Sequence, residues 1–205
     1  KGLKIGLPLS FVALLNAITN FGDKHFVMIY CGAGVVAVYN LASLLATIPV
    51  IVYQSFNFIW LPSFLQEKNL SLLKKKTDRN GLRIFILLFL LCVGIYIGAW
   101  LLLNWGVFPK TYSLIMSILP PLCLAQIFAS LNLFFFNYFI YFEKSYITIL
   151  TSVIINGLSY LLFTFTAPIY GEMGVAYSLL LSNFTLFVIY YLLSSYYVKK
   201  SIKNK

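Results

Sequence analysis

The sequence contains very few charged residues. Asp, Glu, Lys and Arg make up 10% of its 205 residues, 61% are hydrophobic, and the mean hydropathy is +0.91. A soluble domain carries about 25% charged residues, so this chain lacks the polar side chains that would cover a water-soluble fold. Strand-like alternation is also absent, and the apolar runs reach roughly 20 residues. These features predict an all-α integral membrane protein.

The residue types that usually carry catalysis or bind metals are scarce as well. The chain has five acids, one histidine and three cysteines. We expect His25 at a membrane interface, because no second histidine exists to share a metal ion. We interpret Cys31, Cys92 and Cys123 as small apolar fillers. There is no nucleophile–His–acid set and no Gly-rich phosphate loop, so we expect no enzyme, no cofactor and no metal.

Hydropathy divides the chain into six apolar segments that together form one bundle over residues 1–205. The segments cover residues 5–21, 35–60, 82–105, 115–141, 146–167 and 173–197. A polar corner at residues 20–25 is expected to link the first two. Pro49 predicts a bend in the second segment, and Pro120 and Pro121 predict the start or a bend of the fourth. The third segment has almost no polar residues and is expected to be the most lipid-exposed.

The basic residues fall almost entirely on one side of this predicted topology, with only Lys24 and Lys110 on the other. The positive-inside rule therefore places both termini in the cytoplasm. The formal net charge of +10 then faces anionic lipid, and no nucleic-acid partner is expected. The longest loop, residues 65–81, carries Leu70, Leu72 and Leu73 beside several lysines. It is either a short helix on the membrane surface or a solvated basic connector.

Polar residues recur at helical spacing inside the segments. They are Asn16, Asn20 and Asp23; Asn40, Ser43, Thr47, Gln54 and Asn57; Gln126, Ser130 and Asn137; Thr148, Ser152, Asn156 and Ser159; and Ser178, Ser182 and Thr185. Such stripes either line a water-accessible path or join neighbouring helices by hydrogen bonds. For the hydroxyls we favour helix joining. For Asn16, Asn20, Gln54 and Asn57 both interpretations stay open, because a primary amide has four hydrogen-bond positions to satisfy.

Asp23 and Lys24 also have two interpretations. They either anchor the first segment at the outer interface or form the rim of a substrate path. No acid or base lies near the middle of any predicted segment, which argues against a proton relay within this chain.

Several short motifs resemble those of a known transporter family. They are Gly6-Leu7-Pro8, Asn20-Phe21-x-Asp23-Lys24, Tyr39-x-x-Ala42, Trp60-x-Pro62 and Gly171-x-x-Gly174-x-Ala176. Their combination is similar to the polysaccharide biosynthesis flippases of the multidrug/oligosaccharidyl-lipid/polysaccharide superfamily, which export O-antigen and capsule repeat units. The family usually has Arg where this chain has Lys24, and Lys24 is the one cation near the outer mouth of the expected path.

The resemblance implies one six-helix bundle of a transporter with about twelve helices in two bundles, and the motif order indicates the C-terminal half. Because Lys1 is not a start methionine, we expect a fragment that lacks an N-terminal bundle. The implied activity is alternating-access flipping of polyprenyl-diphosphate-linked oligosaccharides across the bacterial cell (inner) membrane, for lipopolysaccharide or capsule synthesis. The implied partners are the lipid-linked substrate, the bilayer, the N-terminal bundle, and polysaccharide polymerase and chain-length proteins.

The residues that we expect along the substrate path follow from the amide stripes and from these motifs. They are Asn16, Asn20, Asp23, Lys24, Tyr39, Asn40, Gln54, Asn57, Gln126, Asn137 and Asn156.

Three other functions stay open. A multidrug or small-molecule/ion antiporter of the same superfamily would need a buried carboxylate for ion coupling, and none falls within a predicted segment. A membrane polymerase or transferase would need an acid- or His-bearing external loop, and the loops opposite the termini are short. A structural membrane subunit with no transport role is the third.

Overall fold

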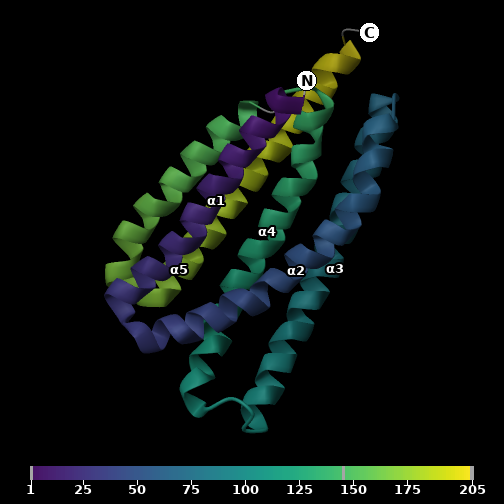
Figure 1. Cartoon of the computed structure of the whole chain (residues 1–205). Helices are drawn as coiled ribbons and strands as arrows, with labels where there is room; N and C mark the ends of the chain where they lie inside the picture. The colour runs from purple at the N-terminus through teal and green to yellow at the C-terminus, as the bar shows by residue number, and fades with distance from the viewer. Residues whose placement is uncertain (1, 145, 204–205) are drawn as a thin grey trace.

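The structure, a computed structural model, consists of long helices joined by short turns (Figure 1). It describes residues 2–144 and 146–203, without the side chains of residues 2–9, 11–13, 16 and 20. The elements are α1 (Gly2–Cys31), α2 (Ala33–Gln66), α3 (Leu70–Asn104), the short 3-10 helix η1 (Lys110–Leu114), α4 (Ile115–Tyr141) and α5 (Tyr146–Lys203). The described part of the chain contains no strand, which confirms the predicted all-α class.

Four of these helices are long and apolar enough to cross a membrane: α2, α3, η1 with α4, and α5. The last of these, α5, has 58 residues and is interrupted at Gly171, where φ is 57° and ψ is −138°. A left-handed backbone of this kind favours glycine. Figure 1 shows the chain reversing there, so that two arms of α5 run side by side. The number of membrane crossings remains a prediction.

The start of α1 and the end of α5 lie at the same end of the molecule (Figure 1). This arrangement agrees with termini on one side of a membrane. Which side that is remains a prediction from the distribution of basic residues.

The predicted polar corner at residues 20–25 does not form. Helix α1 continues through it to Cys31, and the chain turns at Gly32, where φ is 82°. The helix tolerates its polar residues here because Asp23 is buried against α2, where it accepts a hydrogen bond. Gly22 lies directly under the ring of Tyr160, so this turn of α1 is packed against α5.

The basic loop predicted at residues 65–81 is also replaced by helix. Helix α2 ends at Gln66 and α3 already begins at Leu70, so most of the stretch is continuous with α3. Asn69 caps the new helix, since its side chain accepts hydrogen bonds from the backbone N–H groups of Ser71 and Leu72. This stretch therefore does not form a separate short helix, and most of its basic residues lie on the first turns of α3.

An ion pair stabilises the connection between α2 and α3. The Lys76 Nζ and Glu67 Oε2 atoms lie 2.7 Å apart. Lys76, together with the backbone N–H of Asn69, holds the pKa of the Glu67 carboxyl below its usual range. The Tyr141 hydroxyl donates to the Glu67 carbonyl at 3.0 Å, which ties the connection to the end of α4.

Helix α4 forms the centre of the bundle, between α2, α3 and α5 (Figure 1). Its most apolar window is 56% buried, whereas that of α3 is only 17% buried. Aromatic rings fill the interface of α4 with α2: Trp60 stacks on Phe134 at 6.0 Å, and Phe64 meets Tyr138 edge to face at 4.9 Å. Among the four candidate membrane helices α3 is therefore the least buried, and its exposure to lipid remains a prediction.

Gly174 allows the two arms of α5 to approach closely. A Cβ atom at this position would lie 2.5 Å from the Thr166 backbone oxygen, whereas a Cβ atom at Gly157 in the same helix meets nothing within 4 Å. The tip of a flexible side chain could move aside to make room for a Cβ atom, but the Thr166 backbone cannot.

We therefore predict that Gly174→Ala lowers the stability of the protein by about 2 kcal/mol through overpacking. The thermal midpoint of the detergent-solubilised full-length protein would fall accordingly. Gly157→Ala, which also replaces a helical glycine, would leave the midpoint unchanged or raise it slightly. Equal midpoints for the two variants would contradict the close approach of the arms.

Candidate functional site

The most deeply buried acid in the described chain is Asp23. Its side chain is 4% exposed, and Oδ2 accepts a hydrogen bond of 3.4 Å from the hydroxyl of the fully buried Tyr39. Its Oδ1 atom accepts from the backbone N–H of Lys24 at 2.6 Å. A carboxyl group held between two helices, α1 and α2, can change its interactions when it gains or loses a proton. Two residues of the predicted path, Asp23 and Tyr39, thus meet in the structure.

The neighbouring side of α1 carries an amphiphilic groove of about 610 Å³. Two of its lining residues are polar and lie in adjacent positions: Lys24, which is half-buried, and His25, which is exposed. The remaining lining is mainly apolar or aromatic and consists of Ile18, Phe21, Gly22, Met28 and Tyr160. The groove therefore places the Lys24 side chain beside apolar surface. That Lys24 lines a substrate path remains a prediction.

Three of the predicted amides join helices instead of facing open space. Asn137 is buried, and its Nδ2 donates to Asn57 Oδ1 at 2.9 Å, which links α4 to α2. Asn156 accepts a hydrogen bond from Thr19 of α1 and donates to the Ser152 carbonyl at 2.7 Å. For these amides the helix-joining interpretation explains the observed bonds.

Asn40 and Gln54 are placed differently. Both are exposed side chains of α2, on the surface of the helix that the other described elements leave uncovered. Gln126 is half-buried on α4. The side chains of Asn16 and Asn20 lie outside the described part of the structure. Of the predicted path residues whose side chains the structure describes, Asn40 and Gln54 are therefore the exposed ones.

Most Ser and Thr hydroxyls bond within their own helix. Thr77, Ser130, Ser159 and Ser182 each donate to the carbonyl four residues earlier, at 2.8 to 2.9 Å. These bonds satisfy hydroxyl groups in apolar surroundings. Their helical spacing therefore does not indicate a polar path.

Sequence patterns missed several buried polar groups. The Tyr53 hydroxyl and the Trp60 indole N–H are buried and have no hydrogen-bond partner among the described residues. The missed Asn132 donates to the Asn183 carbonyl at 3.2 Å and so joins α4 to α5. An aromatic residue in an apolar run gives no signal that its polar atom will lack a partner.

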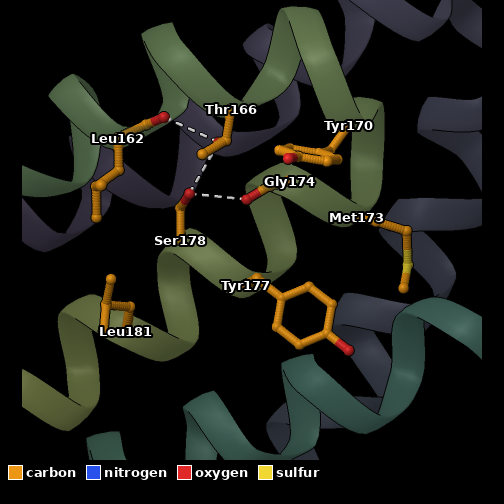
Figure 2. Close-up of a pocket in the computed structure, with 8 residues that line it drawn as sticks. All are labelled: Leu162, Thr166, Tyr170, Met173, Gly174, Tyr177, Ser178 and Leu181. Atoms are coloured by element: carbon orange, nitrogen blue, oxygen red, sulfur yellow. Dashed lines mark hydrogen bonds between the residues drawn. The ribbon is translucent and has the colours of Figure 1, made fainter.

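A second cavity, of about 390 Å³, lies between the arms of α5 near their turn (Figure 2). The two hydroxyl groups in its lining already have hydrogen-bond partners. Thr166 donates to the Leu162 carbonyl and Ser178 to the Gly174 carbonyl, and the two hydroxyl oxygens lie 2.9 Å apart. The other lining residues, Tyr170, Met173, Tyr177 and Leu181, are apolar or aromatic. This cavity offers few free polar contacts for a sugar or an ion.

In the described part of the chain, no group of three His, Cys, Asp or Glu residues is placed to hold a metal.

Comparison with solved structures identifies the fold. The chain is similar to a multidrug resistance MATE family transporter of the MOP superfamily in an outward-facing conformation, with a TM-score of 0.78 and 14% identity over 99% of this chain and 47% of that one. It is also similar to MATE in complex with MaL6, with a TM-score of 0.75, 15% identity, and the same coverage of both chains. No protein-family model and no curated protein matches the sequence.

The chain spans about half the length of these transporters, since it covers 47% of each. Its fold is therefore half of a MATE transporter fold. This finding concerns the fold, and it leaves the substrate open.

The contact between Asp23 and Tyr39 can be tested by removing its hydroxyl donor. We predict that Tyr39→Phe lowers stability by about 1–3 kcal/mol, because the buried carboxyl group loses a hydrogen bond. Tyr53→Phe is the matched control, since it removes a buried hydroxyl that has no partner among the described residues, and it should leave stability unchanged or raise it. Thermal unfolding of the full-length protein in detergent measures both. A larger loss for Tyr53→Phe would contradict this assignment.

Proposed function

We propose that this chain forms one bundle of a two-bundle membrane exporter that works by alternating access. The observation that carries the proposal is the fold, which matches half of a MATE transporter over 99% of this chain. In this proposal the bundle crosses the membrane six times, once with each of α1 to α4 and once with each arm of α5. A second bundle faces the exposed side of α2, and the two rock about the path between them.

We propose a polyprenyl-diphosphate-linked oligosaccharide as the substrate and the bacterial inner membrane as the location, with both termini in the cytoplasm. The motif resemblance supports this choice. So does the placement of Asn40 and Gln54 on the uncovered side of α2, because amides can pair with sugar hydroxyls that would otherwise cross hydrocarbon at a cost of several kcal/mol each. The groove at Lys24 combines a cation with apolar side chains, which suits a phosphate on a lipid tail.

Export in cells tests this function. A clean deletion in a strain without a redundant flippase should leave lipid-linked repeat units facing the cytoplasm and abolish surface polysaccharide. Normal surface polysaccharide in that strain would contradict the proposed substrate.

Substitutions on α1 and α2 test the proposed path. Asn40→Ala and Gln54→Ala should each lower export about fivefold, which corresponds to one hydrogen bond of about 1 kcal/mol. Lys24→Ala should also impair export without lowering the amount of protein in the membrane. Leu44→Ala is the matched control, because Leu44 is exposed on the same helix and offers no polar group. Equal losses of export in all four variants would argue against a polar path.

The burial of Asp23 favours a second candidate function, an ion-coupled multidrug or small-molecule antiporter. No carboxyl group falls within a predicted membrane segment, but Asp23 lies inside α1, just beyond the first predicted segment, and is 4% exposed. Asp23→Asn retains the capacity to accept from Tyr39 while it removes the ionisable group. If the chain belongs to an antiporter, this variant should lose gradient-driven dye efflux. Dye efflux that is unchanged by gene deletion would exclude this candidate.

A further inference from the structure

One exposed face of α3 changes from cationic to apolar along its length. Residues three or four positions apart share a face of a helix. The exposed side chains at such spacing begin with Lys75, Arg79 and Arg83 and continue with Leu82, Ile86, Leu90, Val93 and Ile97. Leu90 is 63% exposed and Leu82 is 62% exposed, so this face is not covered by the rest of the described chain. We call Lys75, Arg79 and Arg83 the α3 cation stripe.

The acids near the stripe are already paired with other lysines. Asp78 Oδ2 lies 3.2 Å from Lys74 Nζ, and Glu67 Oε2 lies 2.7 Å from Lys76 Nζ. Lys74 also donates to the Ser195 hydroxyl of α5 at 3.1 Å. In the described chain, the three residues of the α3 cation stripe have no ion-pair partner. These three cations are therefore left to interact with anions outside the described chain.

The length of α3 places the stripe at a membrane surface. From Arg83 to Trp105 the helix extends about 33 Å at 1.5 Å per residue, close to the roughly 30 Å thickness of a hydrocarbon core. Trp105 is 73% exposed just after the opposite end of the helix, where an interfacial tryptophan is expected. Figure 1 shows α3 at the outer edge of the bundle, with its N-terminal end at the same end of the molecule as the start of α1.

We propose that the α3 cation stripe binds the phosphate group of an anionic phospholipid in the leaflet at the basic end of the bundle. Arg79 and Arg83, one helical turn apart, contact the phosphate oxygens, since a guanidinium group can donate two parallel hydrogen bonds to them. Lys75 adds charge farther from the membrane. The acyl chains lie along Ile86 and Leu90, directly below the arginines on the same face.

An acidic soluble protein fits this face less well. Such a partner would pair with the cations, but it would leave the adjoining exposed Ile86, Leu90 and Val93 side chains without contacts. A phospholipid complements both parts of the face at once. The inference does not depend on the transported substrate, because it requires only that α3 crosses the membrane.

The test is retention of phosphatidylglycerol by the full-length protein, taken from nanodiscs with equal parts phosphatidylglycerol and phosphatidylcholine and analysed by native mass spectrometry. The wild-type protein should retain phosphatidylglycerol in preference to phosphatidylcholine. A triple variant, Lys75→Gln, Arg79→Gln and Arg83→Gln, should lose at least about tenfold of that preference, given about fivefold for each cation near an anionic surface. Because these side chains are exposed, the variant should fold normally, as its elution volume and thermal midpoint can show.

The matched control is Lys199→Gln, Lys200→Gln and Lys203→Gln, which removes the same charge from exposed positions at the end of α5. It should retain the wild-type preference. An equal loss in both triple variants would overturn the proposal, because it would mean that diffuse positive charge attracts the lipid. Unchanged preference in the α3 variant would overturn it as well. Arg79→Lys with Arg83→Lys should lie between wild type and the Gln variant, since charge is kept and paired donation is lost.

Discussion

The structure depends on one constraint: a polar group in hydrocarbon needs a hydrogen-bond partner, and most polar groups of the described helices find one within the protein. Backbone groups meet this constraint by forming helices, and Ser and Thr hydroxyls meet it by bonding to carbonyls of their own helix. The larger side chains reach across helices. Asn137 bonds to Asn57, Asn156 to Thr19, and Tyr39 to Asp23. These bonds join α1, α2, α4 and α5 in a bundle whose apolar contacts alone would not specify which surfaces meet.

The same constraint separates joining residues from available ones. An amide that already bonds to a neighbouring helix has fewer donors and acceptors left to bind a ligand. Asn40 and Gln54 are exposed side chains on the uncovered side of α2, so the polar stripe predicted along this helix divides into a joining part and an available part. That division makes α2 the helix on which the proposed path depends. A second bundle beside it would enclose the available amides.

The helical class and the low burial of α3 could be predicted from the sequence, because composition and hydropathy depend little on which helices touch. The pairing of Asn57 with Asn137 could not, because it depends on the rotation of two helices about their axes, and the two residues are 80 positions apart in the chain. The corner predicted at residues 20–25 was wrong because hydropathy treats Asp23 as the end of a segment, whereas burial against Tyr39 keeps it in the helix. The motif resemblance implied half of a two-bundle transporter fold, and the likeness to MATE structures agrees with that fold, but the motifs do not determine a substrate.

The central claim is that the uncovered side of α2 lines a water-accessible path. Its most direct test is labelling of single cysteines, Asn40→Cys or Gln54→Cys, in full-length protein that lacks Cys31, Cys92 and Cys123, with a membrane-impermeant maleimide applied from each side of the membrane. Leu87→Cys on the exposed, apolar part of α3 gives the lipid-facing reference. We predict rapid labelling at both α2 positions, with the side of access changing between transporter states. Labelling as slow as that at position 87 would contradict the claim.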